Sequence, residues 1–204
     1  MNILQIIVQL IVQCATLLTL GVLARQLFYM RKQYEMDHER SRRETVIKLQ
    51  KLWIETLSDT RTGHSRNLIK DMTPTVCKNF WEEKDITVED TPGNRQILLY
   101  VCSCNEGDLN MMSSKGMIKI EGKNLAIISA HLIKYLNVLE VICTAWNDNV
   151  GDQEMIEKEF GSSITKGNLD SFLLRSPDDR FLSIKAYIMK QQSDNNPKGK
   201  GPIK

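Results

Sequence analysis

The chain has 204 residues, with 27 Lys and Arg against 25 Asp and Glu, so its formal net charge is only +2. A hydrophobic fraction of 42% excludes a wholly disordered chain, and five unevenly spaced cysteines exclude a small disulfide scaffold. The near balance of charge also excludes a strongly basic nucleic-acid-binding protein. These averages hide a division, because residues 1–24 carry no charged side chain and 17 of them are apolar.

Residues 1–24 are predicted to form one transmembrane helix. The 22 uncharged residues from Ile3 to Ala24 would extend over roughly 33 Å as a helix, enough to cross a hydrocarbon core of about 30 Å. A cleaved signal peptide is the alternative, favoured by the small residue before Arg25 but not by the first residues, which lack a basic side chain. Basic residues follow the span and none precedes it, which predicts an N-terminus outside and a body in the cytoplasm.

The polar residues of the predicted span share one face of the helix. At 100° per residue they fall within about 120°, while Cys14 lies on the opposite side. Hydrocarbon offers no hydrogen-bond partner and a lone span has no second helix in its own chain, so the stripe predicts self-association. It would line a water-filled lumen in a ring, join the helices of a tight bundle, or reflect chance clustering. The stripe consists of Asn2, Gln5, Gln9, Gln13, Thr16 and Thr19.

Residues 25–57 are predicted to continue the same helix as a juxtamembrane extension, because no glycine or proline occurs between Gly21 and Gly63. Its first part is charged on every face, as in a solvated stalk or the wall of a pore entrance. The basic side chains predicted to line a cytoplasmic mouth are Arg31, Lys32, Arg40, Arg42 and Arg43. Apolar residues then recur at helical spacing and are predicted to dock on the body: Val46, Leu49, Leu52, Trp53 and Leu57.

Residues 58–190 are predicted to form a small helical cytoplasmic domain, so that the fold class is mainly α. The central prediction is a helix over 125–147 with one broad apolar face. A final helix is predicted to begin at Ser176-Pro177, and the basic tail 191–204 is predicted to be disordered. The remaining predictions are a short helix at 67–71, a polar loop at 84–96, a buried run at 97–103 that is either helix or strand, and a helix over 152–160 that ends at Gly161.

The sequence contains no phosphate-binding glycine loop, nucleophile elbow or HExxH motif, so the chain is not predicted to be an enzyme. A metal site would need Cys102 and Cys104 with Cys77, Cys143 or His131. The cysteine spacing is not that of a zinc knuckle, so we predict free thiols, a core or interface histidine, and no metal or cofactor.

Arg31 and His38 match the Arg-x4-6-His spacing of HEPN-type RNases, in which the histidine and arginine of two paired protomers act on a phosphodiester. The basic residue already has a role next to the membrane, because it contributes to the orientation of the span. A membrane-tethered RNase is therefore only an alternative.

The segment from Tyr135 to Gly161 resembles a signature of small bacterial proteins with one N-terminal span and a cytoplasmic helical domain. With the charged stretch Arg40 to Thr45, the chain is similar to accessory membrane proteins of type VI-B CRISPR systems, a divergent HEPN group. That resemblance implies a ring-shaped homo-oligomeric pore in the bacterial inner membrane that enhances antiphage defence alongside an RNA-guided RNase. The signature positions are Leu136, Asn137, Glu140, Asp152, Glu154, Phe160 and Gly161.

The leading hypothesis is therefore a pore or another membrane-perturbing effector whose partners are further copies of itself and the lipid bilayer. No small-molecule substrate is expected. Two alternatives stay open, namely the tethered RNase and a tethered scaffold that recruits a cytoplasmic complex.

Overall fold

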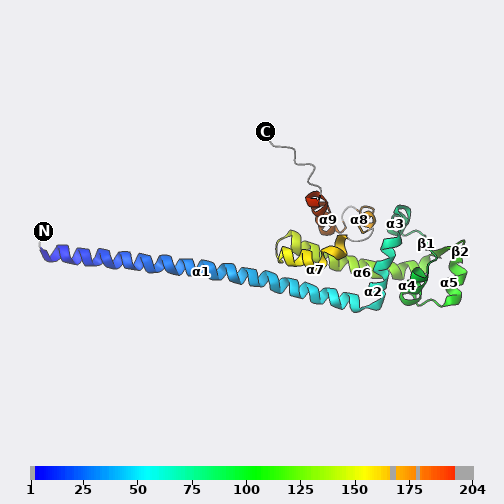
Figure 1. Cartoon of the computed structure of the whole chain (residues 1–204), viewed down its shortest axis with the longest axis horizontal. Coiled ribbons are helices and arrows are strands. Elements are labelled where there is room, and N and C mark those ends of the chain that lie inside the picture. The colour runs from blue at the N-terminus through cyan, green and yellow to red at the C-terminus, as the bar shows by residue number, and fades with distance from the viewer. Residues whose placement is uncertain (1–2, 166–168, 178–179, 196–204) are drawn as a thin grey trace, which may run out of the picture. The chain divides into compact units, whose positions relative to one another are not determined.

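The computed structural model describes residues 3–165, 169–177 and 180–195, and the side chains of 4–6, 8, 9, 194 and 195 lie outside this description. The described chain is mainly helical, as predicted (Figure 1). It divides into two units after Arg43. The helices are α1 (Ile3–Ser58), α2 (Thr60–Asp71), α3 (Pro74–Trp81), α4 (Pro92–Cys102), α5 (Glu106–Met112), α6 (Gly122–Asn147), α7 (Gln153–Thr165), α8 (Leu169–Leu173) and α9 (Leu182–Asn195). The strands are β1 (Ile86–Glu89), β2 (Ser113–Ser114) and β3 (Met117–Ile120).

The first helix, α1, has 56 residues and confirms the prediction of one unbroken helix beyond the apolar segment. Its part after Arg43 belongs to the second unit and docks on the core of that unit. Val46 and Leu49 are buried there, and Trp53 packs edge-on against Phe160 at 5.9 Å between ring centroids. Leu52, which was predicted to dock, is instead 36% exposed.

The central helix of the second unit is α6. Every apolar residue predicted to form its buried face is buried, because the helix keeps the 3.6-residue period over seven turns. Figure 1 shows α4, α5 and the strands near one end of α6, and α7 and α9 near the other. The confirmed face consists of Leu125, Ile128, Leu132, Tyr135, Leu136, Leu139, Ile142, Cys143 and Trp146.

A three-stranded antiparallel sheet, in the order β1-β3-β2, corrects the predicted polar loop at 84–96. Ile86 pairs with Ile120 and Val88 pairs with Ile118, and all four side chains are buried. The loop residue Thr91 caps α4, since its hydroxyl accepts a hydrogen bond from the backbone of Asn94 at 3.1 Å. The run at 97–103, predicted as helix or strand, is therefore the end of a helix that begins at Pro92.

Two helices are longer than predicted. The segment predicted at 67–71 is the end of α2, which begins at Thr60 because the Asp59 side chain accepts a hydrogen bond from the backbone N–H of Arg61. The helix predicted to end at Gly161 continues to Thr165. That glycine serves close packing instead of termination, since a Cβ there would lie 3.2 Å from the Tyr187 hydroxyl.

The last helix, α9, begins at Leu182 and not at the predicted Ser176-Pro177. Its first N–H groups are bound from another helix, because Glu140 of α6 accepts hydrogen bonds from Ser183 N at 2.8 Å and Ile184 N at 3.0 Å. A carboxylate satisfies exposed N–H groups and interacts favourably with the positive end of the helix dipole. The helix extends to Asn195, so the predicted disordered tail at 191–204 is wrong at its start, and 196–204 lie outside the described residues.

Replacing Glu140 with Ala should lower the free energy of unfolding by about 1–2 kcal/mol, because two N–H groups of α9 lose their acceptor. Glu140→Gln keeps one acceptor oxygen and should lose less. Urea denaturation, followed by the fluorescence of the three tryptophans, measures the change. Glu159→Ala, at an exposed position of α7, is the control. Equal stability of the Glu140→Ala and control variants would contradict this role.

Candidate functional site

The main candidate site is the exposed apolar part of α1. Its apolar window is 0% buried, and every side chain from Leu10 to Met30 is exposed. Fully removing its eight large aliphatic side chains between Leu10 and Leu23 from water would contribute on the order of 10 kcal/mol. Nothing among the described residues of the chain supplies that cover. Over these residues α1 is long and apolar enough to cross a membrane, which by itself is weak support for a span.

A second helix, α6, passes the same test of length and apolarity, but 44% of its window is buried within the second unit. It lies among the core residues of that unit, including Leu68, Leu98 and Phe160. This helix is therefore accounted for by the core, whereas the apolar part of α1 is not.

Fewer side chains on the polar face of α1 lack a hydrogen-bond partner than the sequence indicates. The hydroxyl of Thr16 donates to Val12 O and that of Thr19 to Ala15 O, each at 2.8 Å, so both are satisfied within the helix. Gln13 is exposed, and its side-chain amide forms no hydrogen bond within the described part of the chain. Gln5 and Gln9 lie on α1, but their side chains are outside the described residues. Among the described side chains of this face, the Gln13 amide is thus the group that requires a partner.

Aromatic residues that were not among the predicted site residues follow the apolar segment directly. Phe28, Tyr29 and Tyr34 are exposed, and the Arg25 guanidinium lies 5.5 Å from the centroid of the Tyr29 ring. Aromatic rings and basic side chains are enriched where a membrane helix meets the lipid headgroups. Their position on α1, shortly after the end of the uncharged segment at Ala24, is the signal that could have identified them.

The predicted mouth residues are partly neutralised along α1. Arg31 binds Glu35 at 3.0 Å and Arg43 binds Glu39 at 2.6 Å, each pair one helical turn apart. Lys32 and Arg40 are exposed, whereas Arg42 is half-buried and its Nε has no hydrogen-bond partner within the described residues. The structure thus places all five on one charged helix.

The predicted RNase pair is not assembled within one chain. Arg31 and His38 lie seven residues apart on α1, so they are separated by about 10 Å along the helix axis. Arg31 forms a salt bridge with Glu35, and the centroid of the His38 ring lies 6.3 Å from that of the Tyr34 ring. HEPN-type chemistry would therefore require the pair to be completed by a second protomer.

His131 belongs to a polar cluster at the start of α2, in agreement with its predicted structural role. Its Nδ1 lies 3.1 Å from Thr62 Oγ1, whose hydroxyl donates to Asp59. A hydrogen bond from the Lys134 ammonium, 2.8 Å away, lowers the pKa of Asp59 to about 2, while burial lowers the pKa of His131. The cluster thus holds an ionised aspartate and favours a neutral histidine.

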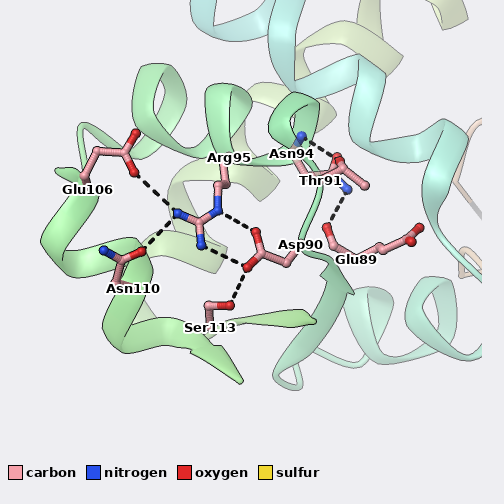
Figure 2. Close-up of polar contacts among 8 residues, drawn as sticks. All are labelled: Glu89, Asp90, Thr91, Asn94, Arg95, Glu106, Asn110 and Ser113. Atoms are coloured by element: carbon pink, nitrogen blue, oxygen red, sulfur yellow. Dashed lines mark hydrogen bonds and ion pairs between the residues drawn. The ribbon is translucent and has the colours of Figure 1, made fainter. Parts of the chain in front are cut away.

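Figure 2 shows a second polar cluster, centred on Arg95 of α4. Arg95 binds Asp90 in a bidentate manner, at 2.5 and 2.9 Å, and donates to Asn110 at 3.0 Å. Ser113 donates to the same aspartate, and these hydrogen bonds lower the pKa of Asp90 to about 2. Because the charged groups are bound to one another, the cluster joins α4, α5 and the sheet and offers no free nucleophile or base.

The cysteines are all free thiols. Cys77 and Cys143 are buried, and burial raises the pKa of both. Among the residues that the structure describes, no three His, Cys, Asp or Glu side chains gather where they could hold a metal ion. Cys102 and Cys104 lie beside each other at the end of α4, where they line a groove.

Comparison with known proteins identifies no relative of this chain: no family model, no curated protein and no solved structure matches it.

The cluster around Asp59 predicts a loss of stability in acid. The folded pKa of Asp59 lies below its ordinary value of 3.8, so its contribution is present above about pH 4 and is lost as the pH falls towards 2. Asp59→Asn should lower the free energy of unfolding by about 1–2 kcal/mol at pH 7 and by much less at pH 2.5, because the wild-type carboxyl is increasingly protonated there. Urea denaturation of the wild type and the variant at both pH values measures the loss of stability. A loss that is the same at both pH values would contradict this role of Asp59.

Proposed function

We propose that this protein is a single-span membrane protein of the bacterial inner membrane whose N-terminal helix assembles with further copies of itself into a pore. The observation that carries the proposal is the uncovered apolar part of α1, which exposes every side chain from Leu10 to Met30. A bilayer would cover this surface on all sides. The aromatic and basic residues that follow, Arg25 and Tyr29 in particular, suit the headgroup region of such a membrane.

Self-association follows from the amides of the polar face. A glutamine amide in hydrocarbon needs partners, and Gln13 has none within the described part of the chain. Gln5, Gln9 and Gln13 recur every four residues, so they extend over roughly 12 Å of the helix. Two protomers could satisfy a single amide. A ladder of three is better suited to a ring, in which each amide meets a neighbour or water.

The charge pattern after the span supports a body in the cytoplasm and an N-terminus outside. In a ring, the basic residues from Arg31 to Arg43 would surround the cytoplasmic mouth. The pairs Arg31–Glu35 and Arg43–Glu39 would reduce its net charge. With uncharged amides along the lumen, such a pore would discriminate weakly between ions.

The biological setting that we propose is antiphage defence, in functional association with an RNA-guided RNase. It rests on the resemblance to type VI-B accessory proteins and not on a matched relative. A pore that opens during infection would collapse the membrane potential and halt the infected cell. The protein would then act without a catalytic residue, a cofactor or a small-molecule substrate.

Replacing Gln5, Gln9 and Gln13 together with Leu should abolish membrane depolarisation, because the lumen would lose its water-binding groups while the apolar helix still inserts. Depolarisation can be measured in expressing cells with a potential-sensitive dye. The matched control changes three residues on the opposite face, Ile7→Leu, Cys14→Leu and Leu18→Ile, and should depolarise like the wild type.

Full depolarisation by the triple glutamine variant, at equal membrane content, would exclude a lumen lined by this face. Loss of phage protection on His38→Ala, with depolarisation unchanged, would favour the tethered RNase. A mature protein that lacks residues 1–24 by mass spectrometry would identify a cleaved signal peptide and remove the proposal.

The polar face can also be tested without a conductance measurement. In a Cys14→Ser background, Gln13→Cys should form disulfide-linked dimers in membranes under mild oxidation, because the stripe faces neighbouring copies. The native Cys14, about 100° away on the helix, should cross-link much less and is the matched control. Strong cross-linking through Cys14 but not through position 13 would place the interface on the apolar face instead.

A further inference from the structure

Three sulfur-containing side chains gather beside the end of α4 in the second unit. Cys102 closes the helix, and the next residue, Ser103, has a left-handed backbone with φ of 55°. A non-glycine residue rarely adopts this conformation, which here turns the chain so that Cys104 returns towards Cys102. The Ser103 hydroxyl accepts a hydrogen bond from Arg61 at 3.3 Å, which holds the turn in place.

Asn124, near the start of α6, contacts all three sulfur-containing side chains. Its carbonyl oxygen lies 3.7 Å from Cys102 Sγ, and its side-chain amide lies 3.9 Å from Met112 Sδ. The Asn124 amide and the Cys102 thiol both lie close enough to the Cys104 thiol to affect its pKa. The three side chains line one groove, together with Met111, whose side chain is 84% exposed at the rim.

Thiolates and thioethers are soft ligands, and together they prefer a soft monovalent ion to hard divalent ones. We propose that this groove is a Cu(I) site in which the sulfurs of Cys102, Cys104 and Met112 bind one ion. Binding replaces two S–H protons with one Cu⁺, so two protons are released and the copper is neither oxidised nor reduced. Two thiolates and one monovalent cation leave a complex with a single negative charge.

The donor set does not suit zinc equally well. Structural zinc requires four ligands, usually thiolate or imidazole. Asp108 lines the same groove, but no group of three His, Cys, Asp or Glu side chains among the described residues is placed to hold a metal ion. Cu(I) accepts two or three ligands, so the thioether of Met112 completes the site.

The test is anaerobic titration of the full chain, in detergent and with reduced thiols, with Cu(I) in competition with a chromophoric Cu(I) chelator. We expect one tightly bound Cu(I) per chain and a near-ultraviolet band from thiolate-to-copper charge transfer. Cys104→Ser should abolish both signals, and Met112→Leu should weaken binding roughly tenfold or more. Cys14→Ser, which removes a thiol in the other unit, is the matched control and should bind like the wild type.

Circular dichroism of each variant separates loss of the site from loss of the fold. Cys102 is the more buried of the pair, so the more accessible Cys104 decides the outcome if Cys102→Ser does not fold. Two results would overturn the proposal: the wild type leaves all Cu(I) with the chelator, or a folded Cys104→Ser variant retains the stoichiometry and affinity of the wild type. Equally tight binding of Zn(II) at the same residues would contradict the assignment of the ion.

Discussion

Both units of this protein contain apolar surface that must be removed from water. Only the second unit buries this surface against its own residues. The apolar windows of α1 and α6 have the same mean hydropathy of 1.6, so composition does not separate them. Their surroundings do. The second unit covers 44% of the window on α6, whereas nothing is buried in the window on α1. A helix with this composition and no cover from its own chain requires another apolar environment.

Helices and strands that depend on nearby residues could be predicted from the sequence. Those that depend on contacts with residues far away in the sequence could not. The apolar period of α6 lies within the helix itself, so its buried face was predicted correctly. The start of α9 depends on Glu140, more than forty residues earlier, and no pattern near Ser176 reveals this. The sheet was missed for the same reason, because Ile86 becomes a strand residue only by pairing with Ile120.

The same distinction applies to the candidate sites. The polar face of α1 could be predicted, since helix geometry alone brings its residues together. That the hydroxyls of Thr16 and Thr19 bind backbone carbonyls one helical turn earlier could be found only from the structure. The cysteine pair was visible as a spacing, but the third sulfur was not. Met112 is connected to the cysteine pair through a contact with Asn124, which lies near the beginning of a different helix.

The signature that suggested a family has structural roles in this fold. Leu136 and Phe160 are core residues, and Glu140 binds the first N–H groups of α9. Asp152 accepts a hydrogen bond from Met155 N at 3.1 Å at the start of α7, and Gly161 makes room for Tyr187. The pattern therefore describes how α6, α7 and α9 are joined. Residues with these roles carry information on architecture, and activity must be sought elsewhere.

The Arg25–Tyr29 contact has a mechanical consequence if α1 crosses a bilayer. It would fix one end of the helix at the headgroups, while the apolar stretch before it is slightly longer than an average hydrocarbon core. In a thinner membrane the excess length would be absorbed by tilt about this fixed end. In a ring of such helices, a common change of tilt alters the bore, so that bilayer thickness itself would act on the assembly.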